Sequence, residues 1–430
     1  MQAKQSNIDR RNFLRTVGAA GLGSVLVSCR QKKQSEPNAV EVQPTQAPAG
    51  QPPQSPPKDQ LAQMPKRKLG KTGVEVPVLA LGTMFNLVDN QIVLRSTLKY
   101  GVNYWDTANN YAGGNSELGI GKFFQNNPET RKDVFLVTKA SSAKTPQEIE
   151  QRLQTSLKRM NTDYIDLYYA PHAASEPAEL TEDIRRWADD AKKRKLIRYF
   201  GFTTHKNMAG LLAAAAKLDW IDVVMPAYNF RIMQDPEMLA AIDACHKANI
   251  GLIAMKTTGK TTLERFRQPI ETEADKKMIA HFQQRGFSPE QACIKLALQD
   301  ERISCAAVQM ENLDVLKANV AAVLDKTELT RADKDVLAEY AGVTCTGYCA
   351  GCAHICDAVL PDTPYVSDIM RYLMYHNSYG HRERAADLFA QIPAGARNKL
   401  LTADYTAVEA RCPQRLPIRE LVAEAFTKLT

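Results

Sequence analysis

The sequence alternates short strand-like segments with longer amphipathic, helix-like segments eight times along its middle part. The strand-like segments are Val76–Thr83, Val102–Ala108, Asp133–Ala140, Tyr164–Ala170, Ile197–Thr203, Ile221–Asn229, Gly251–Thr257 and Ile303–Met310. Eight such units over roughly 260 residues predict the α/β class, as a (β/α)₈ TIM barrel with its active site at the carboxyl ends of the strands. A doubly wound sheet is the alternative, but no Gly-x-Gly-x-x-Gly motif follows the first strand.

The N-terminal part has the features of an export segment followed by a tether. Residues 1–29 contain the pair Arg10-Arg11 and a weakly apolar stretch that ends in Leu-Val-Ser-Cys29. These features resemble a twin-arginine signal joined to a lipoprotein cleavage box. They predict export of a folded protein to the periplasm or cell envelope, with a lipid anchor at Cys29. Residues 30–63 are rich in Gln, Pro, Ser and Ala, which predicts a disordered linker.

The remaining chain divides into two folded parts. The strand–helix alternation assigns residues 64–325 to the barrel, whereas residues 326–430 contain helical patterns and a cysteine cluster. The net charge of +7 comes from 55 Lys and Arg against 48 Asp and Glu, without a long basic run. This mild charge argues against nucleic acid as a partner.

Four polar side chains lie at or just after the ends of three successive strand-like segments: Asp106, Tyr111, Lys139 and His172. Since the strands of a barrel end at one rim, we expect these side chains to converge. Reducing a carbonyl requires an acid for its oxygen, and Tyr111 can serve if Lys139 stabilises the phenolate. Asp106 would keep the lysine charged, and His172 would hold the carbonyl oxygen. Each residue alone has an ordinary structural explanation, but together they favour proton-coupled hydride transfer.

The sequences around these residues resemble the aldo/keto reductase family. The matching stretches are Trp105–Tyr111, Gly114–Gly119, Phe135–Lys139 and Asp166–His172, within a resemblance that extends from about Lys66 to Val323. The resemblance implies that the four residues form a catalytic tetrad with Tyr111 as general acid. It also implies that NADP or NAD lies across the barrel mouth and that the substrate is a small carbonyl compound or alcohol.

The resemblance also implies nucleotide contacts. The corresponding positions are Thr203 for the carboxamide, Thr204 where the family has an amide side chain that a threonine cannot replace, Tyr228 for the nicotinamide ring and Asn319 for the adenine. Several positions depart from the family pattern. Met225 replaces a glutamine, and the residues usually binding the 2′-phosphate of NADP correspond to Gln309, Met310 and Val315. Loss of that positive clamp leaves both NAD and NADP open, with Gly259 and Lys260 as candidate substitutes.

Five of the nine cysteines lie after the barrel: Cys345, Cys349, Cys352, Cys356 and Cys412. The spacing C-x₂-C-x₃-C with a distant Cys-Pro can hold a 4Fe-4S cluster. We predict Cys349, Cys352, Cys356 and Cys412 as its ligands, with Cys345 as the substitute. A Cys₄ zinc site and disulfide bonds are the alternatives. The segment resembles the ferredoxin-like C-terminal extension of some bacterial aldo/keto reductases.

Three functional hypotheses follow. The first is an exported reductase that transfers hydride between a nicotinamide cofactor and a carbonyl or alcohol. The second keeps its nucleotide tightly bound and passes electrons through the cluster to a redox partner. The third is a non-catalytic, redox-sensing barrel. The intact tetrad favours catalysis.

Overall fold

The structure is a computed structural model, and it describes residues 61–259, 273–345, 348–378 and 381–430. The predicted export segment 1–29 with its lipid-anchor position Cys29, most of the predicted linker and Lys260 lie outside the described residues. The described residues belong to one compact unit. Within the described ranges, no helix is both long enough and apolar enough to cross a membrane.

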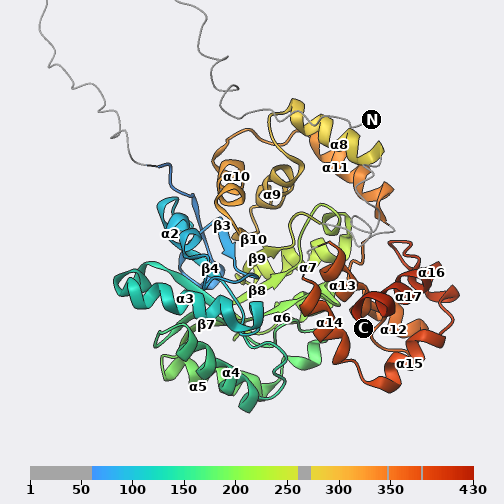
Figure 1. Cartoon of the computed structure of the whole chain (residues 1–430), viewed down its shortest axis with the longest axis horizontal. Coiled ribbons are helices and arrows are strands. Elements are labelled where there is room, and N and C mark those ends of the chain that lie inside the picture. The colour runs from blue at the N-terminus through green and yellow to red at the C-terminus, as the bar shows by residue number, and fades with distance from the viewer. Residues whose placement is uncertain (1–60, 260–272, 346–347, 379–380) are drawn as a thin grey trace, which may run out of the picture. The chain divides into compact units, whose positions relative to one another are not determined.

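Eight parallel strands close into a barrel, which confirms the predicted TIM-barrel fold (Figure 1). In chain order they are β3 (Leu79–Gly82), β4 (Tyr104–Asp106), β5 (Phe135–Lys139), β6 (Ile165–Tyr169), β7 (Ile197–Thr204), β8 (Val223–Pro226), β9 (Gly251–Met255) and β10 (Cys305–Gln309). The barrel closes between β10 and β3, where Ala306 pairs with Leu79. Buried side chains such as Tyr104, Leu167 and Tyr169 fill the interior, so the barrel is a packed core.

Helices surround the barrel strands. They are α2 (Gln91–Lys99), α3 (Asn115–Asn126), α4 (Pro146–Arg159), α5 (Glu182–Lys193), α6 (Met208–Ala215), α7 (Pro236–Lys247), α8 (Glu273–Gln284), α9 (Pro289–Gln299) and α10 (Leu313–Leu324). Short 3₁₀ helices are η1 (Gly70–Thr72), η2 (Tyr111–Gly114), η3 (Pro128–Asp133), η4 (Pro177–Glu179) and η5 (Ile232–Gln234). Thr145 and Ser288 form capping boxes at the starts of α4 and α9. An antiparallel hairpin of β1 (Lys66–Lys68) and β2 (Glu75–Pro77) precedes the barrel.

Helices continue after the barrel to the C-terminus. They are α11 (Arg331–Val343), α12 (Ala353–Val359), α13 (Val366–Asn377), α14 (Arg382–Ala390), α15 (Ala394–Thr402), α16 (Thr406–Arg411) and α17 (Ile418–Leu429). Helix α11 packs on α8 of the barrel, whereas α13, α14 and α17 share a separate apolar core. Ile369, Leu373 and Phe389 are buried in that core because their spacing places them on one face of each helix.

The C-terminal helices are fixed to the barrel by the segment before α12. The backbone N–H of Asn207, after β7, donates to the carbonyl of Gly351 at 2.9 Å. The side-chain amide of Asn229, after β8, donates to the Tyr348 hydroxyl at 3.0 Å. Gly351 has φ of 79°, and a Cβ there would lie 2.0 Å from the carbonyl oxygen of His205. Only glycine allows this approach, which brings α13 and α14 to the carboxyl ends of the strands.

Candidate active site

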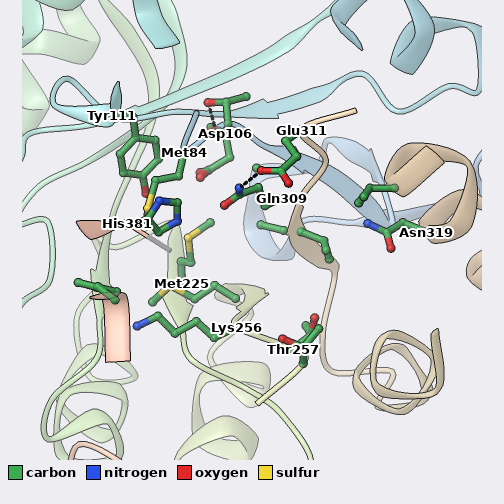
Figure 2. A pocket seen from close by; sticks show the side chains of 18 of the residues that line it. Met84, Asp106, Tyr111, Met225, Lys256, Thr257, Gln309, Glu311, Asn319 and His381 are labelled. Carbon is green, nitrogen blue, oxygen red and sulfur yellow. Dashed lines mark hydrogen bonds between the residues drawn. The ribbon is translucent and has the colours of Figure 1, made fainter. Parts of the chain in front are cut away.

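A cavity of about 480 Å³ opens at the carboxyl ends of the barrel strands. Its walls come from the strand ends, from the starts of α9 and α10, and from the C-terminal helices. Figure 2 shows Tyr111, His381 and the amino group of Lys256 toward one end of the cavity and Asn319 toward the other. One end of the cavity therefore carries the Tyr111 hydroxyl and the Lys256 amino group, and the other end carries the Asn319 amide.

The four residues of the predicted tetrad all line this cavity. Lys139 donates from Nζ to the Asp106 carboxylate at 2.5 Å and to the Thr107 carbonyl at 2.6 Å. The same amino group lies 4.9 Å from the centre of the Tyr111 ring. The rings of Tyr111 and His172 face each other edge-on, with centroids 6.4 Å apart. The barrel topology thus brings the four side chains together.

Burial and neighbouring charges act in opposite directions on the pKa values of Tyr111 and Lys139. Burial raises the pKa of Tyr111 above its usual 10.0, although Lys139 and Arg384 act to lower it. Burial alone would lower the pKa of Lys139, but the Asp106 carboxylate and Tyr111 outweigh burial, so that pKa is raised. Lys139 lowers the Tyr111 pKa as expected, but burial is the larger effect. Tyr111 is therefore protonated at neutral pH.

His172 is a neutral hydrogen-bonding group. Burial, helped by the nearby cations Lys139 and Arg384, holds its pKa well below the usual 6.5. Its Nδ1 lies 2.6 Å from the Ser141 hydroxyl, which also lies 2.8 Å from the Asn110 side chain. The Ser141 hydroxyl donates to Asn110 Oδ1, so it accepts from Nδ1–H, and the single ring proton of neutral His172 is on Nδ1. Exchanging the oxygen and nitrogen of the Asn110 amide reverses both hydrogen bonds and puts the proton on Nε2, which can then donate to a carbonyl oxygen.

The segment after Tyr111 is held by buried polar contacts. Its backbone is left-handed through Ala112, Gly113 and Gly114, and a Cβ on Gly114 would lie 2.9 Å from the Arg159 guanidinium. Ser116, at the start of α3, donates to the Thr83 carbonyl at 2.8 Å. The next residue, Glu117, accepts from Thr138 of β5 at 2.7 Å. These contacts fix η2 against the strand ends and thereby position Tyr111.

Two of the four predicted nucleotide-binding residues line the cavity. Thr203 of β7 is buried, and its hydroxyl accepts from the Ala173 N–H at 2.8 Å. Asn319 of α10 is 6% exposed, and its side-chain NH₂ has no hydrogen-bond partner among the described residues. A buried amide donor without a partner is costly, and it is typical of a site where a ligand supplies the acceptor.

The other two predicted nucleotide-binding residues do not line the cavity. The Thr204 hydroxyl donates to the carbonyls of Ala174 and Lys206, both at 2.9 Å. Tyr228 is fully buried and its hydroxyl donates to the Asp300 carboxylate at 2.5 Å. The structure does not support the predicted stacking of Tyr228 on the nicotinamide ring, because its ring is turned into the contact between the barrel and its helices.

The positions of the expected phosphate clamp carry no cation. Gln309 and Val315 line the cavity, whereas Met310 is fully buried. Gln309 donates to the Glu311 carboxylate at 3.0 Å (Figure 2). Met225, in the place of a family glutamine, lines the cavity floor with its thioether.

Sequence reasoning missed the contribution of the C-terminal helices to the cavity. The additional lining residues are Tyr375, Ser378, His381 and Arg384, with Lys256 opposite them after β9. Lys256 could have been found from its position directly after a strand, as Lys139 was. The C-terminal residues had no such local signal, because they lie in or beside amphipathic helices and reach the barrel only through tertiary packing.

The four predicted cluster ligands line one small cavity beneath α13. They are Cys349, Cys352, Cys356 and Cys412, and Cys345 does not line it. Apolar side chains such as Val366, Met370 and Leu416 complete the wall. All eight cysteines of the described residues carry free thiols, and among those residues no three His, Cys, Asp or Glu form a group placed to hold a single metal ion.

Comparisons with known proteins agree with the barrel fold. A sequence model of the aldo/keto reductase family matches residues 79–336, which is more than half of the chain. An aldo-keto reductase of Schizosaccharomyces pombe, named with NADP(+), is 28% identical over 218 residues, which are 46% of this chain and 62% of that protein. The alignment therefore spans less than two thirds of the yeast protein.

Two further proteins match over most of their own length. L-glyceraldehyde 3-phosphate reductase of Escherichia coli O157:H7 is 24% identical over 328 residues, 65% of this chain and 94% of that protein. The structure of an aldo-keto reductase from Bacillus halodurans in its holo form superposes with a TM-score of 0.53 at 21% identity, over 65% of this chain and 96% of that one. This superposition shows that the barrels share a fold.

Proposed function

The chain belongs to the aldo/keto reductase family and is an NAD(P)H-dependent oxidoreductase that reduces carbonyl compounds, and we propose that the four converging rim residues are its catalytic residues. They are Asp106, Tyr111, Lys139 and His172. The observation that carries the proposal is a protonated tyrosine beside a buried Lys–Asp pair and a neutral histidine at one end of a cavity.

Each residue has a separate role in the reduction. The reduced nicotinamide supplies a hydride to the carbonyl carbon. Tyr111 donates its hydroxyl proton to the carbonyl oxygen, so the carbonyl becomes an alcohol and the tyrosine a phenolate. Lys139 stabilises the phenolate and Asp106 keeps the lysine charged and oriented. His172 orients the oxygen through Nε2 in the tautomer that carries the ring proton there, and it contributes no net charge.

Replacing Tyr111 by phenylalanine tests this assignment. We expect Tyr111→Phe to lower kcat for carbonyl reduction by about 10²- to 10⁴-fold, because the proton donor is lost while the ring remains. Nucleotide affinity, measured by calorimetry, should be retained. Tyr164→Phe is the matched control, because Tyr164 precedes β6 at the opposite end of the barrel. Full turnover by Tyr111→Phe would contradict the proposal and favour a non-catalytic barrel.

The cavity residues fit a nicotinamide nucleotide that extends from Tyr111 to Asn319. The unpartnered Asn319 amide can donate to an adenine nitrogen, and the part of the cavity that Thr203 lines can hold the nicotinamide. At the Asn319 end, the described lining includes Glu290 and Glu311 but neither Lys nor Arg, which favours the 2′-hydroxyl of NAD. Using NADP would require a cation such as Lys260, which lies outside the described residues. Extraction and identification of the bound nucleotide distinguishes the two.

We further propose that the cysteine cavity holds a 4Fe-4S cluster. Four thiols from two distant segments line one apolar cavity, as a cluster with four cysteine ligands requires. A cube-shaped cluster separates its thiolates more widely than one zinc ion does. This accords with the absence, among the described residues, of a group placed around one ion.

Metal analysis after anaerobic purification tests the cluster. We expect about four iron and four sulfide per chain, with broad visible absorption that bleaches on reduction. Near-stoichiometric zinc without iron would establish the zinc alternative, and the absence of both metals together with lost thiol titre would establish disulfides.

We also propose that the chain is exported by the twin-arginine route and anchored to a membrane through a lipid on Cys29. The support is the arginine pair and the Leu-Val-Ser-Cys sequence that follows it. Metabolic labelling with a fatty acid should mark the full chain and not Cys29→Ser, and equal labelling of both would refute the anchor.

A further inference from the structure

The C-terminal helices form a cationic wall beside the catalytic tyrosine. The Arg384 guanidinium of α14 lies 5.5 Å from the centre of the Tyr111 ring and 5.7 Å from that of Tyr375. The Lys256 amino group, which follows β9, lies 4.7 Å from the centre of the Tyr375 ring. All four residues line the cavity. Two cations from different parts of the fold therefore face the place where the carbonyl is reduced.

The carboxylates that line the cavity do not neutralise this wall. Asp106 is paired with Lys139. Glu311 accepts from Gln309, toward the nucleotide end (Figure 2). Glu290 lies beside Gln291, which donates to the Ala318 carbonyl next to Asn319. The acidic side chains are thus paired or at the other end, and the substrate end is left positive.

Two further observations describe the groups of this wall. Although burial acts to raise the pKa of Tyr375, the cations Lys256, Arg384 and Arg371 together lower it below the usual 10.0. Arg384 Nε and the hydroxyl of Ser378, both on cavity-lining residues, have no hydrogen-bond partner among the described residues. Buried donors without a partner are typical of a binding site in which the ligand supplies the hydrogen-bond acceptor.

We propose that the substrate carries an anionic group, a carboxylate or a phosphate, that binds Arg384 and Lys256 while its carbonyl lies at Tyr111 and His172. A guanidinium binds both anions through paired N–H groups, and an ammonium adds a point charge. Tyr375 holds Lys256 in place at the wall. This inference rests on the proposed reductase function and names its substrate class. It also gives the C-terminal helices a role in substrate selection.

The test compares pairs of carbonyl probes in which one member carries an anionic group and the other is neutral. For the carboxylate, kcat/KM is measured for 4-carboxybenzaldehyde and for methyl 4-formylbenzoate. For the phosphate, dihydroxyacetone phosphate is compared with dihydroxyacetone. The wild-type protein should prefer the charged member of at least one pair, which identifies the anion. Arg384→Gln should reduce that preference by about 10- to 100-fold, as expected for a lost charge-assisted hydrogen bond.

Two further variants control the comparison. Arg384→Lys keeps the charge and should retain part of the preference. Arg382→Gln changes an exposed arginine on the same helix and should leave the preference unchanged. The inference is overturned if the wild type shows no preference in either pair, or if Arg384→Gln slows both members equally. The proposed function fails on a different result, namely turnover of the probes by Tyr111→Phe.

Discussion

Tyr111 receives positive charge from two sides of the molecule. Lys139 reaches it from β5 and Arg384 from α14, yet burial is the larger effect and keeps its pKa above 10.0. A reductase needs this residue protonated in the resting state, so the raised pKa suits the direction of reduction. In the proposed reduction the two cations act later, when they stabilise the phenolate that forms as the proton leaves Tyr111.

These shifts predict the pH dependence of reduction. Because the acid must be protonated and its pKa lies above 10.0, kcat/KM should remain level through neutral pH and decline only above about pH 10. His172, with its pKa well below 6.5, should cause no loss between pH 6 and 7. Initial rates with a neutral carbonyl probe measure the profile. A decline centred near pH 8 would show that the cations outweigh burial.

Helix α13 connects the two cavities. Val366, Ser367 and Met370, in its first half, line the cysteine cavity, whereas Tyr375 and the following Ser378 line the catalytic cavity. A group bound by the cysteines would therefore hold one end of the helix whose other end contacts the substrate site. This arrangement would give the proposed cluster a structural role whether or not it transfers electrons.

Removing one cluster ligand tests that structural role. If the proposed cluster joins α12 to the end of α16, Cys412→Ser should lose iron and make these two helices more susceptible to limited proteolysis. Cys345→Ser is the matched control, because Cys345 does not line the cavity. If Cys345→Ser lost as much iron as Cys412→Ser, Cys345 would be a ligand in place of one of the four assigned cysteines.

At the scale of the whole molecule, the C-terminal helices complete a cavity that the barrel begins. The junction depends on the segment around Gly351, which contacts the loops after β7 and β8. Through this junction, residues such as Arg384 come to lie beside Tyr111, more than two hundred and fifty positions earlier in the chain. A barrel without these helices would lack one wall of its substrate site.

A single methyl group at the junction should weaken it. Gly351→Ala places a Cβ against the His205 carbonyl and forces a left-handed backbone, which alone costs roughly 1–2 kcal/mol. The melting temperature should therefore fall by at least about 2 °C. Gly342→Ala, in α11 with open space around it, should be neutral or stabilising. Equal melting curves for Gly351→Ala and the wild type would contradict the close approach.

The barrel and the convergence of the four predicted tetrad residues on its rim followed from the sequence alone, because parallel strands bring their carboxyl ends to one rim whatever the loops do. Local patterns placed Asp106, Lys139 and His172 at strand ends, and Tyr111 shortly after one. Long-range packing sets the direction in which other side chains point. Tyr228 points to Asp300, 72 positions away, and Arg384 reaches Tyr111 through the docked helices. Contacts of such sequence separation leave no local periodicity, so no pattern could have predicted them.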